Sequence, residues 1–233
     1  MKVLVVDVGG SHVKLAIGAG NWSARFESGS GLTPSTLVSG VLDEVAGHEF
    51  DVVSLGYPGA VNRDGPAAEP GNLGEGWVGF DFPGAFERPV RIVNDAVMQA
   101  VGGYDGGRML FLGLGTGLGS ALVTEQVVVP LELGTLPYGR GETLAERVGH
   151  RGLEKHGKLV WRRAVEQVTG ALRAAFVADY VMLGGGNAEH LETLPAGARL
   201  GGNEDAFAGG FRLWEEVVEP HDRRPPAVWR VVR

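Results

Sequence analysis

Apolar and polar positions follow the same order in two segments of this chain. In the first, apolar residues at 3–6 run into a turn with two glycines, and apolar positions then alternate along 12–17. In the second, apolar residues at 109–112 lead into a run with glycine at every second position, and a β-rich run follows at 120–129. Buried strands have such patterns. The sequence therefore predicts a repeated arrangement of strand, glycine turn and strand.

Further periodic segments follow each predicted hairpin. Their order indicates two α/β halves that meet near 96–108, where glycines cluster. The predicted elements are a helix at 35–47, strands at 51–56 and 90–93, a helix at 95–102, a long helix at 159–177 and a strand at 180–183.

Two stretches lack this periodicity. Residues 62–89 are rich in glycine, proline and acidic residues, which predicts an excursion over the surface or over a cleft. Residues 220–233 are rich in proline and arginine, which predicts a loosely attached tail.

Charge and composition exclude several classes of protein. A net charge of -7 argues against a nucleic-acid partner, because binding phosphates requires clustered lysine and arginine. The chain has no cysteine, so disulfides and thiolate metal sites are excluded, and its six histidines form no HExxH pair. No zinc site is therefore expected. The short apolar run before Asp7 predicts a buried strand and neither a signal peptide nor a membrane span.

The two glycine turns are candidate phosphate sites. Glycines beside Asp7 and Thr116 let backbone N–H groups approach an anion, and hydroxyl groups can add donors. Neither turn is a Walker A loop, and the second lacks the strand–turn–helix context of a dinucleotide site. One such turn alone is more simply a tight hairpin, but the pair favours phosphate binding. The Asp7 carboxylate can hold magnesium, directly or through water, or stabilise the turn.

A third glycine run, 184–186, follows a predicted strand and leads into Asn187. The end of a parallel strand is a place where a flat ligand can rest on backbone, so an adenosine site is one interpretation. A plain strand-to-helix turn is the other.

Asp95 stands where a predicted strand passes straight into a helix. As a general base, it would contribute about 10²–10⁴ in rate, with Asn94 bound to the same substrate. Asparagine and aspartate are also good N-caps, and the roles of helix cap and general base are compatible.

Three residues in loops have two interpretations each. The carboxylates of Glu132 and Glu142 can accept hydrogen bonds from sugar hydroxyls, or they are solvated surface acids. Trp77 can line a sugar pocket, but a tryptophan in a long loop more often anchors that loop.

Six motifs, in this order, resemble those of the ROK family of sugar kinases from residue 3 to about 215. The absence of zinc cysteines and the segment 72–77 are most similar to its polyphosphate/ATP glucokinase branch. The motifs are Asp7-Val8-Gly9-Gly10-Ser11-His12-Val13-Lys14, Gly56-Tyr57-Pro58-Gly59, Val93-Asn94-Asp95-Ala96, Leu114-Gly115-Thr116-Gly117-Leu118-Gly119, Glu132-Leu133-Gly134 and Leu183-Gly184-Gly185-Gly186.

The resemblance implies an α/β, actin-like (ribonuclease H-like), two-lobed sugar kinase fold. It implies an N-terminal lobe at 1–97, a C-terminal lobe at 98–204, a terminal helix at 205–219 returning toward the first lobe, and a flexible tail at 220–233. It also implies a cytoplasmic homodimer with no membrane partner.

The resemblance also implies a role for each motif. Asp95 would be the catalytic base that activates the 6-hydroxyl of glucose or a related hexose, with Mg²⁺ at Asp7 and with ATP or polyphosphate as phosphoryl donor. The hexose would contact Gly59, Asn72, Asn94, Asp95, Glu132 and Glu142. The donor would contact Asp7, Gly9, Gly10, Ser11, Lys14, Gly115, Thr116, Gly117, Gly184, Gly185 and Gly186.

One position departs from the family pattern. Thr135 stands where the family has a histidine that contacts the sugar, and the shorter side chain puts glucose specificity in doubt. The chain also has little room between Gly152 and Trp161, which predicts a trimmed sugar-side lobe. The donor stays open, because the third glycine run favours an adenine nucleotide, whereas polyphosphate requires basic residues along an open cleft.

Three alternatives remain. A sugar-responsive repressor would carry a winged helix before the first turn, and both the early position of Asp7 and the acidic charge oppose it. A sugar- or nucleotide-binding protein without catalysis is favoured by Thr135 and opposed by the retained Asp7 and Asp95. An actin-like ATPase or chaperone would give no reason for the pair of Asn94 and Asp95.

Overall fold

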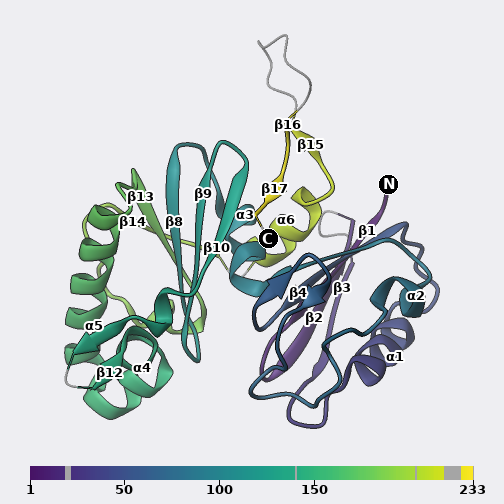
Figure 1. The fold of residues 1–233 in the computed structure, drawn as a ribbon, viewed down its shortest axis with the longest axis horizontal. Coiled ribbons are helices and arrows are strands. Elements are labelled where there is room, and N and C mark those ends of the chain that lie inside the picture. Colours follow the sequence, from purple (N-terminus) through teal and green to yellow (C-terminus); the bar gives the residue numbers. More distant parts are fainter. Residues whose placement is uncertain (19–21, 140, 203, 218–226, 233) are drawn as a thin grey trace. The chain divides into compact units, whose positions relative to one another are not determined.

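The computed structural model describes residues 1–18, 22–139, 141–202, 204–217 and 227–232 (Figure 1). They divide into two compact units. Unit 1 comprises Met1–Gly102 and Ala206–Trp229, and unit 2 comprises Gly103–Asp205 and Arg230–Val232. The lobe limits expected from the sequence stay predictions. Within the described ranges, no helix is both long and apolar enough to cross a membrane.

The sheet of unit 1 has the strand order β3-β2-β1-β4-β7. β1 and β4 are buried along their whole length, as continuous apolar runs require of central strands. β1 runs antiparallel to β2 and parallel to β4, which places Asp7 opposite both Lys14 and Gly56. The strands are β1 Val3–Val8, β2 His12–Ile17, β3 Trp22–Glu27, β4 Val52–Tyr57 and β7 Val90–Asn94.

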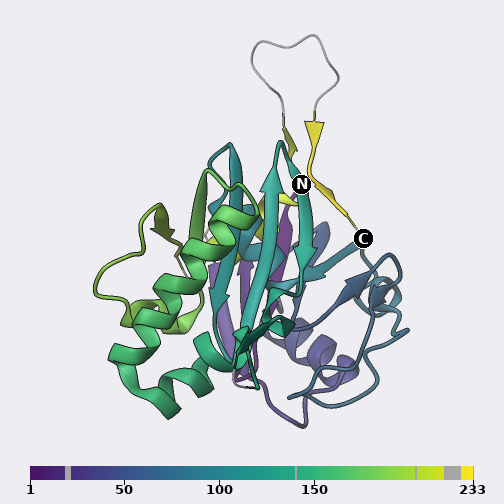
Figure 2. The same ribbon diagram turned by 60° about the vertical axis from the view of Figure 1, so that its left-hand side comes forward.

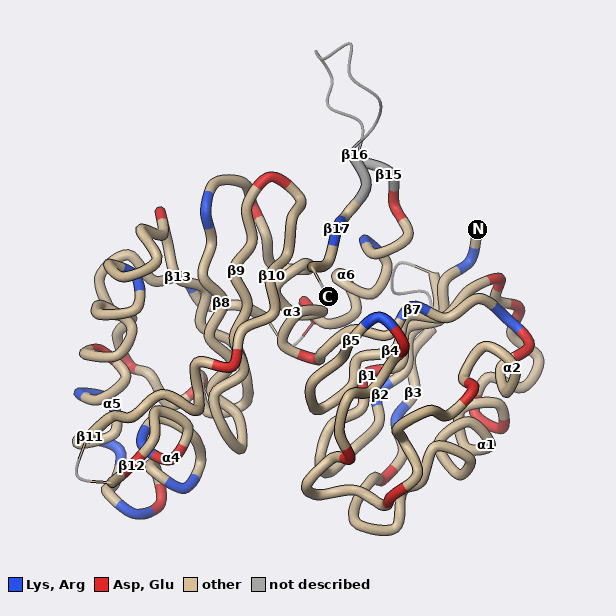
Figure 3. The backbone as a smooth tube through the Cα atoms, viewed as in Figure 1, with Lys and Arg blue, Asp and Glu red and all other residues tan. Residues whose placement is uncertain are grey.

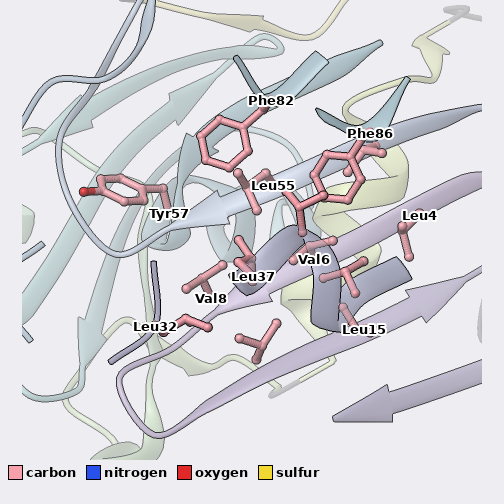
Figure 4. Packing of buried hydrophobic residues seen from close by; sticks show 14 of the residues in the cluster. Leu4, Val6, Val8, Leu15, Leu32, Leu37, Leu55, Tyr57, Phe82 and Phe86 are labelled. Carbon is pink, nitrogen blue, oxygen red and sulfur yellow. The ribbon is translucent and has the colours of Figure 1, made fainter. Parts of the chain in front are cut away.

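Helices α1 (Pro34–Glu44) and α2 (Phe82–Phe86) cover one face of this sheet. Thr33 starts α1 as its N-cap, because its hydroxyl accepts a hydrogen bond from the Thr36 N–H. Alternate residues of β1 meet the apolar side of both helices in one buried cluster. Figure 4 shows this cluster, including Leu4, Val6, Val8, Leu37, Phe82 and Phe86.

The opposite face of the sheet packs against α3 (Asp95–Gly103) and α6 (Asp205–Arg212). The backbone of α6 approaches closely, since a methyl group on Gly210 would overlap Val5 and one on Gly209 would overlap the carbonyl of Met98. The buried Ser54 donates to the Gly210 carbonyl at 2.6 Å. α6 therefore completes the core of unit 1.

Unit 2 contains a sheet with the order β14-β13-β8-β9-β10-β17. Its first five strands repeat the unit 1 arrangement, because β9 and β10 pair antiparallel on one side of β8 while β13 and β14 pair parallel on the other. The repeat predicted from the sequence is thus present in the structure. The strands are β8 Arg108–Leu114, β9 Leu118–Thr124, β10 Val127–Leu131, β13 Tyr180–Gly184, β14 Ala198–Leu200 and β17 Arg230–Val231.

Helix α5 (His150–Ala175) lies along one face of this sheet (Figures 1 and 2). Its buried residues, Trp161 among them, share an apolar cluster with Leu110 and Leu183 of the strands. Shorter elements of the chain are β5 Val61–Asn62, β6 Gly65–Pro66, η1 Leu133–Thr135, β11 Pro137–Gly139, β12 Glu142–Thr143, α4 Leu144–Val148, η2 Gly186–His190, β15 Glu216–Val217 and β16 Ala227–Val228.

Two expectations need correction. The helix predicted at 159–177 begins earlier, at His150, with a break at Gly157, where φ is 74° and ψ is 161°. Its first turns are polar and present no apolar stripe, so periodicity did not reveal them. The tail predicted at 220–233 is wrong for Arg230–Val231, which pair with β10. Residues 218–226 and 233 lie outside the described part of the chain.

Candidate functional site

The first glycine turn joins β1 to β2 in unit 1. The Gly9 N–H donates to the His12 carbonyl at 3.0 Å and closes the turn. Ser28 donates to the turn twice, from its hydroxyl to the Gly9 carbonyl at 2.7 Å and from its N–H to the Ser11 carbonyl at 3.0 Å. Gly10 and Ser11 remain exposed. The turn is therefore held by its carbonyls and open at its tip.

Asp7 lies at the base of this turn and is 8% exposed. Burial raises the pKa of its carboxyl, and the ammonium of Lys14 partly offsets that rise. An oxygen donor of this kind fits Mg²⁺, and a bound cation would favour the ionised carboxylate. Among the described residues, no three histidine, aspartate or glutamate side chains gather as a metal site. Asp7 thus fits an ion whose remaining ligands are water and substrate phosphates.

Asn94 organises the junction between β7 and α3. Its Oδ1 accepts from the N–H groups of Ala96 at 2.9 Å and Val97 at 3.3 Å, so Asn94 is the N-cap of α3. Its Nδ2 donates to the Gly59 carbonyl at 3.0 Å. The structure therefore brings together Asn94 and Gly59, two of the predicted sugar residues.

Asp95 is the first residue of α3 and is half-buried. Its Oδ1 accepts from the Ala96 N–H at 2.8 Å. Of the two residues considered as caps, Asn94 caps the helix with its side chain, and Asp95 follows it at the end of a parallel strand pair.

Asn72 lies against the first glycine turn. A methyl group on Gly10 would overlap the Asn72 amide nitrogen, so glycine allows this close approach. A predicted sugar residue thus lies beside a predicted phosphate residue within unit 1.

Trp77 anchors the long loop that carries Asn72. Its ring is fully buried, 5.3 Å from that of Tyr57, and its Nε1 donates to the Gly74 carbonyl at 2.8 Å. The Glu69 carboxylate accepts from the Trp77 N–H at 3.1 Å, which lowers its pKa, and from the Val78 N–H at 3.2 Å. The interpretation of Trp77 as an anchor is confirmed.

The second glycine turn, 115–117, joins β8 to β9 in unit 2. The third glycine run lies next to it, because a Cβ on Gly185 would be 2.7 Å from the Leu114 backbone. Gly149 approaches from the corner between α4 and α5, where a Cβ would be 2.7 Å from the Thr116 carbonyl oxygen. The predicted phosphate turn and the predicted adenosine turn are therefore neighbours.

Thr135 is the last residue of η1, and Glu132 is the residue before η1. The Thr135 hydroxyl donates to the Glu132 carbonyl at 2.7 Å, and both residues are exposed. The threonine that replaces the family histidine is thus bonded to its own turn.

Glu142 takes part in an ion-pair cluster that sequence reasoning missed. Lys155 bonds its carboxylate, Arg147 lies at 3.6 Å and His156 at 3.4 Å. The hydrogen bond from Lys155 is the main cause that lowers the pKa of Glu142. Figure 3 shows acidic and basic residues side by side around β12 and α4. Glu142 is thus an ion-paired acid rather than a simply solvated one, and its role as a sugar ligand stays a prediction.

The predicted site residues fall into two groups, one in each unit, and their functional roles stay predictions. Unit 1 holds Asp7, Gly9, Gly10, Ser11, Lys14, Gly59, Asn72, Asn94 and Asp95. Unit 2 holds Gly115, Thr116, Gly117, Glu132, Glu142, Gly184, Gly185 and Gly186.

No protein-family model and no curated protein matches this chain. Solved structures do match it. The inorganic polyphosphate/ATP-glucomannokinase of Arthrobacter sp. strain KM has a TM-score of 0.73 at 21% identity, over 90% of this chain and 96% of that one. The ROK hexokinase of Thermus thermophilus has a TM-score of 0.65 at 20% identity, with coverage of 90% and 96%.

A third match is the ROK family glucokinase of Streptomyces griseus, solved with glucose and AMPPNP. Its TM-score is 0.67 at 16% identity, over 90% of this chain and 98% of that one. At such identities the similarity establishes the fold. The actin-like (ribonuclease H-like) α/β fold is confirmed, and so is the resemblance in fold to the ROK sugar kinases.

Proposed function

We propose that this chain is a ROK-type sugar kinase that transfers a phosphoryl group from ATP or polyphosphate to the 6-hydroxyl of glucose or a related hexose. The sugar oxygen forms a bond to the terminal phosphorus, and the bond from that phosphorus to the bridging oxygen of the donor breaks. Asp95 takes the proton of the hydroxyl. The pair of Asn94 and Asp95 carries the proposal.

The division of labour in that pair supports Asp95 as the base. Asn94 caps α3 through Oδ1 and binds the Gly59 carbonyl through Nδ2. This fixes the strand–helix junction and holds the Asp95 carboxylate on a rigid element. A carboxylate held in this way can accept a proton within the short distance that general base catalysis requires.

Asp7 supports the proposal on the side of the phosphoryl donor. Its buried carboxylate lies below the exposed Gly10 and Ser11 and would hold Mg²⁺. When bound, the ion would neutralise charge that develops on the transferred phosphate. The Asp7 carboxylate itself would keep the ion at this turn.

The identity of the hexose and the donor belongs to the same proposal. The Streptomyces griseus structure contains glucose and AMPPNP, and the Arthrobacter enzyme is named for both polyphosphate and ATP. These names support testing both donors. Thr135, bonded to the Glu132 carbonyl, supports a sugar preference that differs from that of enzymes with histidine there. The cytoplasmic homodimer stays a prediction from the resemblance.

The test is a coupled assay of sugar-6-phosphate formation with magnesium, ATP or polyphosphate, and a panel of hexoses. Asp95→Asn should lower kcat about 10²- to 10⁴-fold, because asparagine cannot take the proton. The asparagine Oδ1 can still accept from the Ala96 N–H, so the fold should persist. Asp43→Asn, at an exposed position of α1, is the matched control and should keep full activity.

Two results would reject the proposal. One is turnover in Asp95→Asn equal to that of the wild type. The other is an absence of turnover with every hexose and donor while calorimetry detects sugar binding, which would favour a sugar- or nucleotide-binding regulatory protein.

A further inference from the structure

The carbonyl of Gly115, in the second glycine turn, accepts two hydrogen bonds from outside the turn. The His150 N–H, at the start of α5, donates to it at 2.9 Å. The Asn187 Nδ2, in η2, donates to it at 2.8 Å. The Gly115 N–H is held as well, by the carbonyls of Gly113 at 3.1 Å and Gly117 at 3.3 Å. The donors from α5 and η2 therefore fix the orientation of the peptide group between Gly115 and Thr116.

That orientation determines where the next N–H points. The described residues contain no cis peptide bond, and in a trans peptide the carbonyl and the following N–H point in opposite directions. The Gly115 carbonyl points toward Asn187, which is 8% exposed. The Thr116 N–H consequently points away from Asn187. Thr116 itself is exposed.

Asn187 is held in a single orientation. Because its Nδ2 faces the Gly115 carbonyl, its Oδ1 is the atom that lies 3.4 Å from Nδ1 of His150, and the ring nitrogen is the donor. The turn before Asn187 is fixed too, since Gly185, with φ of 80°, packs against the Leu114 backbone. Asn187 therefore links the third glycine run to the second.

We propose that Asn187 and the backbone N–H of His150 are positioning groups that aim the Thr116 N–H at the phosphate chain of the donor. This inference rests on the proposed function, in which the second turn binds the inner phosphates. Without the two donors, the peptide after Gly115 can rotate, because Gly115 has no Cβ to restrict it. Rotation would present a carbonyl oxygen to the phosphates, which repels them.

Asn187→Asp tests the side-chain donor. The substitution keeps size and shape but replaces the Nδ2 donor with an acceptor facing the Gly115 carbonyl. Calorimetry with inorganic tripolyphosphate and with ADP should show binding weakened at least about tenfold, as for the loss of a hydrogen bond to a charged group. Glucose binding should be unchanged. In the kinase assay, the KM for the donor should rise while the KM for the hexose stays constant.

His150 provides a second test that leaves the buried core intact. It is the first residue of α5, where proline is tolerated, and Gly149 before it has an extended backbone with φ of -79° and ψ of -173°. His150→Pro removes the N–H that binds the Gly115 carbonyl and directs the proline Cδ at that oxygen, so the carbonyl must turn away, whereas His150→Ala keeps the N–H. Tripolyphosphate binding should weaken more in His150→Pro than in the matched His150→Ala. Circular dichroism should show the same helix content in both.

The outcomes separate this inference from the kinase proposal. An active wild type whose tripolyphosphate affinity and donor KM are unchanged in folded N187D and H150P would overturn the inference alone. Equal weakening in H150A and H150P would overturn the role of the backbone N–H. A wild type that binds no tripolyphosphate would overturn the inference as well. Tripolyphosphate binding that both variants weaken, in a chain without phosphoryl transfer, would support the inference and reject the kinase.

If N187D fails to fold, the proline and alanine pair decides the question. Both changes are at an exposed residue at the start of α5 and leave the bond from the Asn187 Nδ2 to the Gly115 carbonyl in place.

Discussion

The two glycine turns occupy matching places in two sheets that share an arrangement of five strands, yet they are built differently. The first turn lies above a buried carboxylate, Asp7, with Lys14 on the adjacent strand. The second turn is held by neutral donors, because the Gly115 carbonyl accepts from the Asn187 side-chain amide and from the backbone N–H at the start of α5. Charged side chains therefore flank the first turn, and neutral donors hold the second. A repeated fold therefore determines where a loop lies and leaves its chemistry open.

The carboxylates of the two units differ in the same way. Burial raises the pKa of Asp7, whereas the Lys155 ammonium lowers that of Glu142. The first carboxylate destabilises the folded chain when it ionises, and the second stabilises it. Removing the charge of Asp7 should therefore raise the stability of the fold at neutral pH, and removing the charge of Glu142 should lower it.

The largest expected effect is that of Asp7→Asn. Turnover should fall about 100-fold or more, because the charge that would hold magnesium at the first turn in the proposed kinase is lost. The melting temperature at pH 7 should rise. A carboxyl whose folded pKa is raised favours folding below its unfolded pKa, and this contribution is lost as pH rises through the folded pKa. The gain should therefore shrink as pH falls toward 4.

Thermal melts at pH 7 and pH 4, together with the kinase assay, measure both effects. Asp64→Asn, at an exposed residue of unit 1, is the control and should change neither quantity. A melting temperature that drops at pH 7 would show that Asp7 stabilises the fold, and the comparison with Glu142 would then be wrong.

A smaller effect is expected from Gly185→Ala. The residue has φ of 80°, and its Cβ would lie 2.7 Å from the Leu114 backbone. The left-handed conformation alone should cost about 1–3 kcal/mol of unfolding free energy. Gly186→Ala is the matched control, since a Cβ there meets nothing within 4 Å. Urea denaturation measures the difference.

The first turn should tolerate the equivalent change better. A methyl group on Gly10 meets only the end of the exposed Asn72 side chain, which can move. If Gly10→Ala and Gly185→Ala were equally destabilising, the distinction between an adaptable first turn and a rigid second turn would fail.

The smallest effect is that of Glu142→Gln, which should lower the urea midpoint at pH 7. A carboxyl with a lowered folded pKa contributes stability above its unfolded pKa and loses it as pH falls through the folded pKa. The difference from the wild type should therefore disappear in acid. Glu166→Gln, at an exposed position of α5, is the control. A difference that persists in acid would rule out the ion pairs as its cause.

Much of the fold could be predicted because its central strands are continuous apolar runs and its turns contain glycine. The hairpin between β9 and β10 was harder to predict, because the sequence indicated only one β-rich run there. Its turn residues, Glu125 and Gln126, have φ of 47° and 57°, which glycine or asparagine usually signals. Strand β17 was missed because two residues paired with a distant strand carry no periodic signal.

The candidate site was predictable where a motif carries it. The pair of Asn94 and Asp95 stood out at the strand–helix junction, and the contact with Gly59 follows from the parallel pairing of β4 with β7. The bond from Asn187 to Gly115 spans 72 residues and ends on a carbonyl, so no residue type marks it. The partners of Glu142 come from two helices and are equally invisible to spacing.

The packing of α6 on β1, β4 and α3 has a consequence for biosynthesis. Residues 1–102 leave the ribosome long before 206–212, so the nascent unit 1 exposes the face around Val5 and Ser54 until α6 emerges. All of unit 2 except β17 has been synthesised by then. The second half of the chain can fold while the first is unfinished, which makes that open apolar face the place where a chaperone would be needed.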